Sequence, residues 1–148
     1  MALAHAGYPI DSDADRVRRS TPDPVNQRID RLTDDNIAYY RSAGRAEILG
    51  RMHELDREWD IERVLEVNAS TLALTGLALG TTVNRKWLLL TGGVLAFLLQ
   101  HGLQGWCPPL PLLRRLGVRT RDEIAREKFA LQSLLEERQP APRQEAPA

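Results

Sequence analysis

The sequence predicts an all-α protein built on a two-helix transmembrane hairpin, with amphipathic cytoplasmic helices on both sides and disordered termini. Three observations predict it. Two segments of the 148-residue chain, 67–83 and 87–106, contain no charged residue, and only the short turn at 84–86 separates them. Charged residues crowd the segments that flank this pair. In those flanks the apolar residues recur at helical spacing, and no stretch alternates in the manner of a strand.

Composition excludes several classes of function. The formal net charge is zero and the pI is about 6.8, so nothing in the overall charge indicates a nucleic-acid partner. A single cysteine excludes an internal disulfide framework and any all-cysteine metal site. The three histidines are scattered, and we expect neither a metal nor a cofactor. The N-terminal residues lack the basic leader and long apolar stretch of a secretory signal.

The segment before the hairpin divides into two parts. Residues 1–22 are polar and mixed, without a helical or strand period, and predict a disordered N-terminus. Residues 23–66 predict amphipathic cytoplasmic helices, opened by Asp23 as the N-cap and Pro24 at the first helical position. A second helix start is expected at Thr33. An apolar stripe with spacings of four, three and four follows, with a charged, solvated face opposite, and its members are Ile48, Met52, Leu55 and Trp59.

The two uncharged segments have the lengths of membrane crossings. At about 1.5 Å of rise per residue, helices over 67–83 and 87–106 would extend about 25 Å and 30 Å. The hairpin domain, 67–107, is therefore interpreted as two crossings joined by a tight turn. The alternative is a soluble helical domain with a buried hairpin. The rest of the chain offers little apolar surface to wrap two such helices, which favours the membrane.

Small residues predict how the two helices pack. Gly76 and Gly80 form a GxxxG pair on the first helix, and Gly92 and Ala96 have the same spacing on the second. Lipid gives helices no hydrophobic reason to associate, so close approach at small residues must supply the contact energy. This small-residue surface either closes the hairpin on itself or joins two protomers in a homo-oligomer.

Basic and aromatic residues predict the orientation. The turn carries only Arg85 and Lys86, whereas arginines are numerous beyond the outer ends of both crossings. The positive-inside rule then places both termini in the cytoplasm. The three tryptophans lie near the expected membrane interfaces, as residues of an aromatic belt do, and they are Trp59, Trp87 and Trp106.

The segment after the hairpin predicts two more cytoplasmic helices within 108–138. Pro108 and Pro109 must end a regular helix. Thr120 and Glu123 form a capping box that opens the last helix. The tail, 139–148, is rich in proline and alanine and predicts a disordered end.

The segment GWCPPLPLLRRLGVRT, with the leucine- and glycine-rich hairpin before it, resembles the transmembrane domain of the YgaP-like inner-membrane proteins of bacteria. The resemblance covers about residues 60–120, and its most specific part is Gly105 to Pro108. It implies a two-helix hairpin in the bacterial inner (cytoplasmic) membrane. Many members join this domain to a rhodanese, a sulfurtransferase that this chain lacks. Only the hairpin and the position of Cys107 therefore carry over, in a subgroup with charged helices in place of the rhodanese.

Cys107 has two interpretations. As a reactive thiol it would need a nearby cation to lower its pKa, and Arg114 and Arg115 are the candidates. A polar stripe on the second crossing would lead to it, formed by Gln100 and Gln104, with His101 beside them. As a structural residue it would be a small apolar side chain at the point where a helix leaves the membrane.

Two functions follow from these interpretations. The first is a non-enzymatic membrane scaffold or interaction module, whose partners are the lipid bilayer and a membrane or cytoplasmic protein. The second is a component of sulfur relay, thiol redox chemistry or transport of small sulfur species. It would use Cys107, with a separate sulfurtransferase as its partner.

Overall fold

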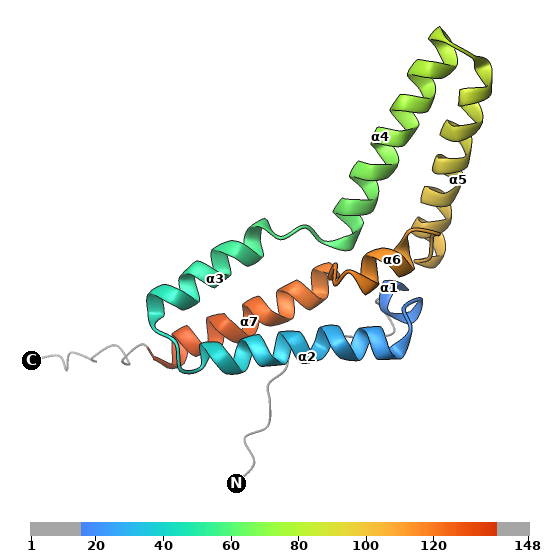
Figure 1. Cartoon of the computed structure of the whole chain (residues 1–148). Helices are drawn as coiled ribbons and strands as arrows, with labels where there is room; N and C mark the ends of the chain where they lie inside the picture. The colour runs from blue at the N-terminus through green and yellow to red at the C-terminus, as the bar shows by residue number, and fades with distance from the viewer. Residues whose placement is uncertain (1–15, 139–148) are drawn as a thin grey trace, which may run out of the picture.

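The computed structural model describes residues 16–138, and every regular element in that range is a helix, as the sequence predicted. A hairpin of α4 and α5 projects from one end of an elongated body of α2, α3 and α7 (Figure 1). The helices in chain order are α1 (Arg16–Arg19), α2 (Asp23–Tyr40), α3 (Arg45–Arg57), α4 (Ile61–Thr82), the 3-10 turn η1 (Arg85–Trp87), α5 (Leu88–Gln104), α6 (Leu110–Arg115) and α7 (Arg121–Glu137). The expected disorder of 1–15 and 139–148 lies outside the described residues.

The body has an apolar core between its three long helices. α3 contributes Ile48 and Leu55, and α7 contributes Leu131 and Leu135, at the helical spacings that place each pair on one face. α2 covers this core as one uninterrupted helix. The expected second start at Thr33 is wrong, because Thr33 lies inside α2 with its side chain buried.

The start of the body differs from the prediction. Residues 16–22, expected to be disordered, contain α1 and the turn that leads into α2. Val17 is buried in an apolar cluster below the hairpin, which gives this short helix the tertiary support that its length alone could not provide. Asp23 is not the N-cap: α2 begins at Asp23, and Pro22 precedes it without a side-chain cap.

The predicted apolar stripe from Ile48 to Trp59 does not lie on one helix, because the chain leaves the helical conformation at 58–60. Glu58 is extended, and Asp60 caps the next helix by accepting a hydrogen bond from the Arg63 backbone N–H at 2.7 Å. α4 therefore starts at Ile61, and the predicted boundary between residues 66 and 67 falls inside one continuous helix.

The hairpin is closed by the glycines of α4. A Cβ at Gly76 would lie 2.6 Å from Thr91 Oγ1, and one at Gly80 would lie 2.6 Å from Leu88 Cδ2. These two glycines lie at the contact between the helices. On α5, Gly92 and Ala96 do not close the hairpin, because both are exposed and no atom lies within 4 Å of a Cβ built at Gly92. A homo-oligomer formed through this face stays a prediction.

Thr91, one residue before Gly92, occupies the contact instead. Its hydroxyl donates a hydrogen bond to the Ala73 carbonyl at 3.0 Å, across the hairpin. With Thr91 at the contact, the predicted small-residue face of α5 points away from α4.

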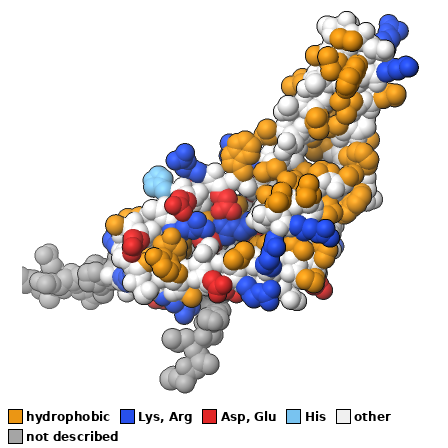
Figure 2. Space-filling view, in the orientation of Figure 1, with side chains coloured by type: hydrophobic (Ala, Val, Ile, Leu, Met, Phe, Trp, Pro, Cys, Tyr) orange, Lys and Arg blue, Asp and Glu red, His pale blue; other side chains and the backbone are white. Residues whose placement is uncertain are grey.

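The outer surface of the hairpin is apolar. No residue of α5 is buried, and hydrophobic side chains cover the hairpin, with basic side chains at its tip (Figure 2). Two segments, Arg45–Thr82 and Arg85–Gln104, are long and apolar enough, by length and composition, to cross a membrane. Charged side chains of both signs gather over the body (Figure 2).

Two glycines turn the chain back from the hairpin to the body. Gly105 ends α5 in the left-handed conformation, with φ of 72°, and a Cβ there would collide with Arg16. Gly117 (φ 90°) follows α6 in the same conformation. The predicted capping box is confirmed, because the Thr120 and Glu123 side chains each bond the backbone N–H of the other.

Candidate functional site

Cys107 lies in an apolar cluster where the hairpin meets the body. This junction cluster consists of Val17, Ile61, Leu65, Cys107 and Leu110. Cys107 is 3% exposed. Burial raises the pKa of its thiol, and a backbone hydrogen bond with Leu110 offsets part of that effect. A thiol in these surroundings is held in its neutral, weakly nucleophilic form.

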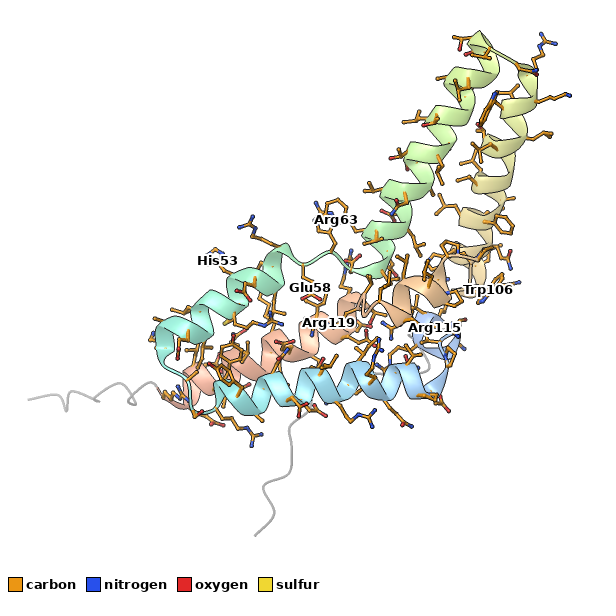
Figure 3. All side chains as sticks on the ribbon, in the orientation of Figure 1. His53, Glu58, Arg63, Trp106, Arg115 and Arg119 are labelled. Carbon is orange, nitrogen blue, oxygen red and sulfur yellow. The ribbon has the colours of Figure 1, made fainter. Side chains whose placement is uncertain are left out.

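The two arginines expected to activate Cys107 serve other contacts or face solvent. Arg114 is fully buried, and its guanidinium donates to Glu123, to the Val118 carbonyl and to Asn26. Arg115 is exposed, near Trp106 at the outer corner of α6 (Figure 3). Neither guanidinium is therefore hydrogen-bonded to the sulfur of Cys107.

The predicted polar stripe does not reach the thiol. α5 ends at Gln104, so Cys107 is off the helix on which Gln100 and Gln104 lie. Asn68, a possible partner across the hairpin, instead donates to the Val64 carbonyl of its own helix at 2.7 Å. Of the three polar residues, only His101 lines a cavity.

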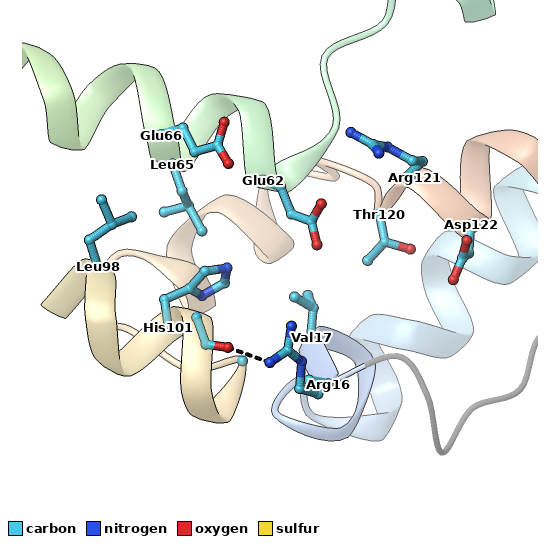
Figure 4. A pocket seen from close by; sticks show the side chains of 12 residues that line it. Arg16, Val17, Glu62, Leu65, Glu66, Leu98, His101, Thr120, Arg121 and Asp122 are labelled. Carbon is cyan, nitrogen blue, oxygen red and sulfur yellow. Dashed lines mark hydrogen bonds between the residues drawn. The ribbon is translucent and has the colours of Figure 1, made fainter.

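That cavity lies at the base of the hairpin (Figure 4). Its volume is about 500 Å³. α4, α5, α1 and the start of α7 supply its walls. The lining side chains are Arg16, Val17, Glu62, Leu65, Glu66, Leu98, His101, Thr120, Arg121 and Asp122, with Gly102 and Gly105.

The charged groups of this cavity lie on different walls. Glu62 and Glu66 are one turn apart on α4, above the imidazole of His101 (Figure 4). Arg16 lies on the opposite wall and donates to the Gly102 carbonyl. His101 Nδ1 is buried and has no hydrogen-bond partner among the described residues. With Arg121 and Asp122 at its far end, the cavity presents three carboxylates, a partly buried imidazole and two guanidinium groups to one space.

Sequence reasoning missed most of this cavity. Arg16 falls in the segment predicted to be disordered, and Glu62 and Glu66 were assigned to a solvated charged face. One signal was available: Glu62 and Glu66 are four residues apart, one helical turn before the first crossing, and His101 is in the last turns of the second. In an antiparallel hairpin those positions lie at the same end.

Below the cavity, two ion-pair networks tie the body together. In the first, Glu123 accepts hydrogen bonds from Arg114 at 2.7 Å and also pairs with Arg18. Burial alone would raise the pKa of Glu123. The hydrogen bonds and charge of Arg114 outweigh that effect, and the pKa is lowered. Glu123 is therefore a carboxylate deep inside the protein.

The second network joins the three long helices. Arg119 pairs with Glu58 at 2.6 Å and with Glu127, and Arg51 pairs with Glu127 at 2.8 Å. Glu58 and Arg119 face each other between α3 and α7 (Figure 3). Burial alone would lower the pKa of Arg119, but its bonds to the two glutamates raise it. These residues hold α3 and α7 together, and Arg119 donates to Thr33 of α2 as well.

Within residues 16–138, no group of three or more histidine, cysteine or acidic side chains is arranged to hold a metal ion. Comparison of the chain with protein-family models, with curated proteins and with solved structures finds no match.

Proposed function

We propose that this chain is a small multi-pass protein of the bacterial inner membrane that acts as a non-enzymatic scaffold. It would anchor the body of α2, α3 and α7 at the cytoplasmic surface as an interaction module for another protein. The observation that carries the proposal is α5, an apolar helix that buries none of its residues. The resemblance of its hairpin to YgaP-like transmembrane domains supports the same conclusion.

The exposed apolar surface of the hairpin supports a lipid environment. α5 exposes Leu89, Leu99 and Leu103 by 65% or more, and α4 exposes Leu74 to a similar extent. Soluble monomers rarely expose a contiguous apolar surface of this kind, since each Å² left in water costs about 25 cal/mol. A bilayer removes that cost, and both helices have enough length to cross it.

The distribution of charge supports the orientation with both termini in the cytoplasm. The tip of the hairpin carries only Arg85 and Lys86, whereas the body at its other end contains many arginines. Trp59 and Trp106 are both partly exposed near that end, and Trp87 is exposed near the tip. Tryptophans at both ends match the aromatic belts of membrane helices.

The body supports the scaffold part of the proposal. It has its own apolar core and two ion-pair networks, so it forms a defined surface at the base of the hairpin. The burial of Cys107 and its raised pKa favour a structural thiol over the alternative of sulfur relay or thiol redox chemistry.

Alkaline carbonate washing of membranes from expressing cells tests this function. We expect the full chain to remain in the pellet and to enter the soluble fraction only with detergent. A reporter enzyme that works only in the cytoplasm should be active when it is fused after Ala148. One that works only outside the cytoplasm should be inactive at the same position. A chain that stays monomeric and dissolved without detergent would exclude the membrane scaffold.

A further inference from the structure

We propose that the cavity at the base of the hairpin binds the headgroup of phosphatidylethanolamine. The ammonium would bind Glu62 and Glu66, and the phosphate would bind Arg16 and Arg121. This inference rests on the proposed function, because it takes the hairpin to lie in a bilayer. The chemistry that the site would recognise is a phosphate diester that carries a primary ammonium, and we assign its source to the lipid.

The shape and lining of the cavity match such a ligand. Its volume of about 500 Å³ lies within the range of small-molecule sites, about 300–1,000 Å³. Leu98 and Leu65 line it on the hairpin side, and Arg121 and Asp122 line it on the side of the body (Figure 4). The cavity therefore offers apolar side chains at its hairpin end, where acyl chains could leave it, and charged side chains on both walls for a headgroup that lies across it.

Two carboxylates of this cavity are open to a cation. The side chains of Glu62 and Glu66 are exposed, and neither makes a hydrogen bond or ion pair in the part of the chain that the structure describes. They lie in the turn of α4 that directly precedes its uncharged part. An anion in that position next to a bilayer is disfavoured by the low polarity and by the charge of anionic lipids. An ethanolamine ammonium has three N–H donors and a positive charge, so it can satisfy both carboxylates.

His101 supplies a further reason for a polar ligand. Its Nδ1 is buried and has no partner among the described residues, although the imidazole lies beside the acidic wall (Figure 4). A buried polar atom without a hydrogen bond is costly, and a rotation of the imidazole toward the cavity would let a ligand supply the missing bond. The ammonium can donate to this nitrogen, whereas the choline of phosphatidylcholine has no N–H to donate.

The basic side of the cavity fits the phosphate. Arg16 uses one guanidinium nitrogen for the Gly102 carbonyl, which fixes its head at the cavity wall. Arg121 pairs with Asp60 only at 3.4 Å and is 75% exposed, so its planar donors can turn toward a phosphate oxygen. Opposite charges on opposite walls match a zwitterion.

Native mass spectrometry of the full chain in detergent, with phosphatidylethanolamine and phosphatidylcholine at equal concentration, tests the site. We expect retained phosphatidylethanolamine to exceed phosphatidylcholine by about tenfold, the effect of one charge-assisted hydrogen bond. The double variant Glu62→Gln/Glu66→Gln should lose that preference. The matched control, Asp35→Asn/Glu137→Gln, removes two exposed acids of the body and should keep it. Equal retention of both lipids by the unaltered chain would overturn the proposal.

A second arm separates the lipid from a soluble ligand. Glycerophosphoethanolamine is titrated into the same sample while the imidazole NMR signals of His101 are followed. A shift from the soluble ester, without retention of the lipid, would overturn the lipid assignment. If the chain proves soluble without detergent, the proposed function fails, and the titration decides the cavity alone. In that case, a shift in the natural chain that is absent from Glu62→Gln/Glu66→Gln supports the proposed chemistry of the cavity. The absence of a shift in the natural chain overturns it.

Discussion

Arg114 and Glu123 form an ion pair that is closed to solvent, with side chains 0% and 2% exposed and an Nη1–Oε2 distance of 2.7 Å. Glu123 also completes the capping box of α7 by accepting from the Thr120 backbone N–H. One carboxylate therefore joins α6, the start of α7 and, through Arg18, α1. The short helices at the base of the hairpin depend on this pair for their positions.

The substitution Glu123→Gln should destabilise the body strongly. Glutamine keeps an oxygen for the Thr120 N–H but leaves Arg114 as a buried charge without a counter-ion, which costs about 3–5 kcal/mol. Denaturant unfolding in non-ionic detergent, followed by circular dichroism, measures the loss. Glu137→Gln, at an exposed position of the same helix, should change the free energy of unfolding by no more than about 0.5 kcal/mol. Equal effects of the two substitutions would contradict the importance of the pair.

The same pair should make stability depend on acid pH. The folded state holds the pKa of Glu123 below the ordinary 4.5, so the stability it contributes is complete above pH 4.5. That contribution is lost as the pH falls through the lower folded pKa, where the carboxylate takes up a proton. Unfolding free energies measured between pH 7 and acid conditions should converge for the natural chain and Glu123→Gln. A difference that stays constant with pH would be incompatible with this linkage.

Gly76→Ala should destabilise the hairpin. The new Cβ would lie 2.6 Å from Thr91 Oγ1 and 3.1 Å from the Thr91 backbone nitrogen, and the backbone cannot rotate away as a side chain can. Overpacking of this kind costs about 1–3 kcal/mol. Gly92→Ala is the matched control, since nothing lies near its Cβ and alanine favours a helix by about 1 kcal/mol. Thermal unfolding in detergent should rank Gly76→Ala below the natural chain and Gly92→Ala at or above it.

Cys107 should react slowly while the protein is folded. Its thiol is buried and its pKa is raised, so alkylation in native membranes should be slower than in denaturant at the same pH. Exposure to a sulfur donor should give no more persulfide in the natural chain than in Cys107→Ser. Fast alkylation below the ordinary thiol pKa, or clear persulfide labelling that Cys107→Ser abolishes, would instead favour sulfur relay.

Local signals predicted much of the fold. Two uncharged stretches with a polar turn between them predicted the hairpin of α4 and α5, because two apolar helices joined by a short turn must lie antiparallel. The capping box at Thr120 was also predictable, because both of its hydrogen bonds join residues only three apart in sequence.

What the sequence could not predict depends on contacts between distant segments. The rotation of α5, and so the outward direction of Gly92, follows the contacts of Leu88 and Thr91 with α4. The order of residues 16–22 comes from the burial of Val17 against residues more than forty positions away. The cavity is missed for the same reason, because Arg16, Glu62 and His101 meet only after the hairpin and the body have packed.

The backbone N–H of Ile61, the first residue of α4, donates to the Arg119 carbonyl at 2.8 Å, and only three residues separate α3 from α4. The hairpin is therefore attached to the body by a short segment that is itself hydrogen-bonded to the body, rather than by a loose linker. Under the proposed function, a protein docked on the body would be held at a set angle to the lipid surface, and a change in the tilt of the hairpin would turn the body with it.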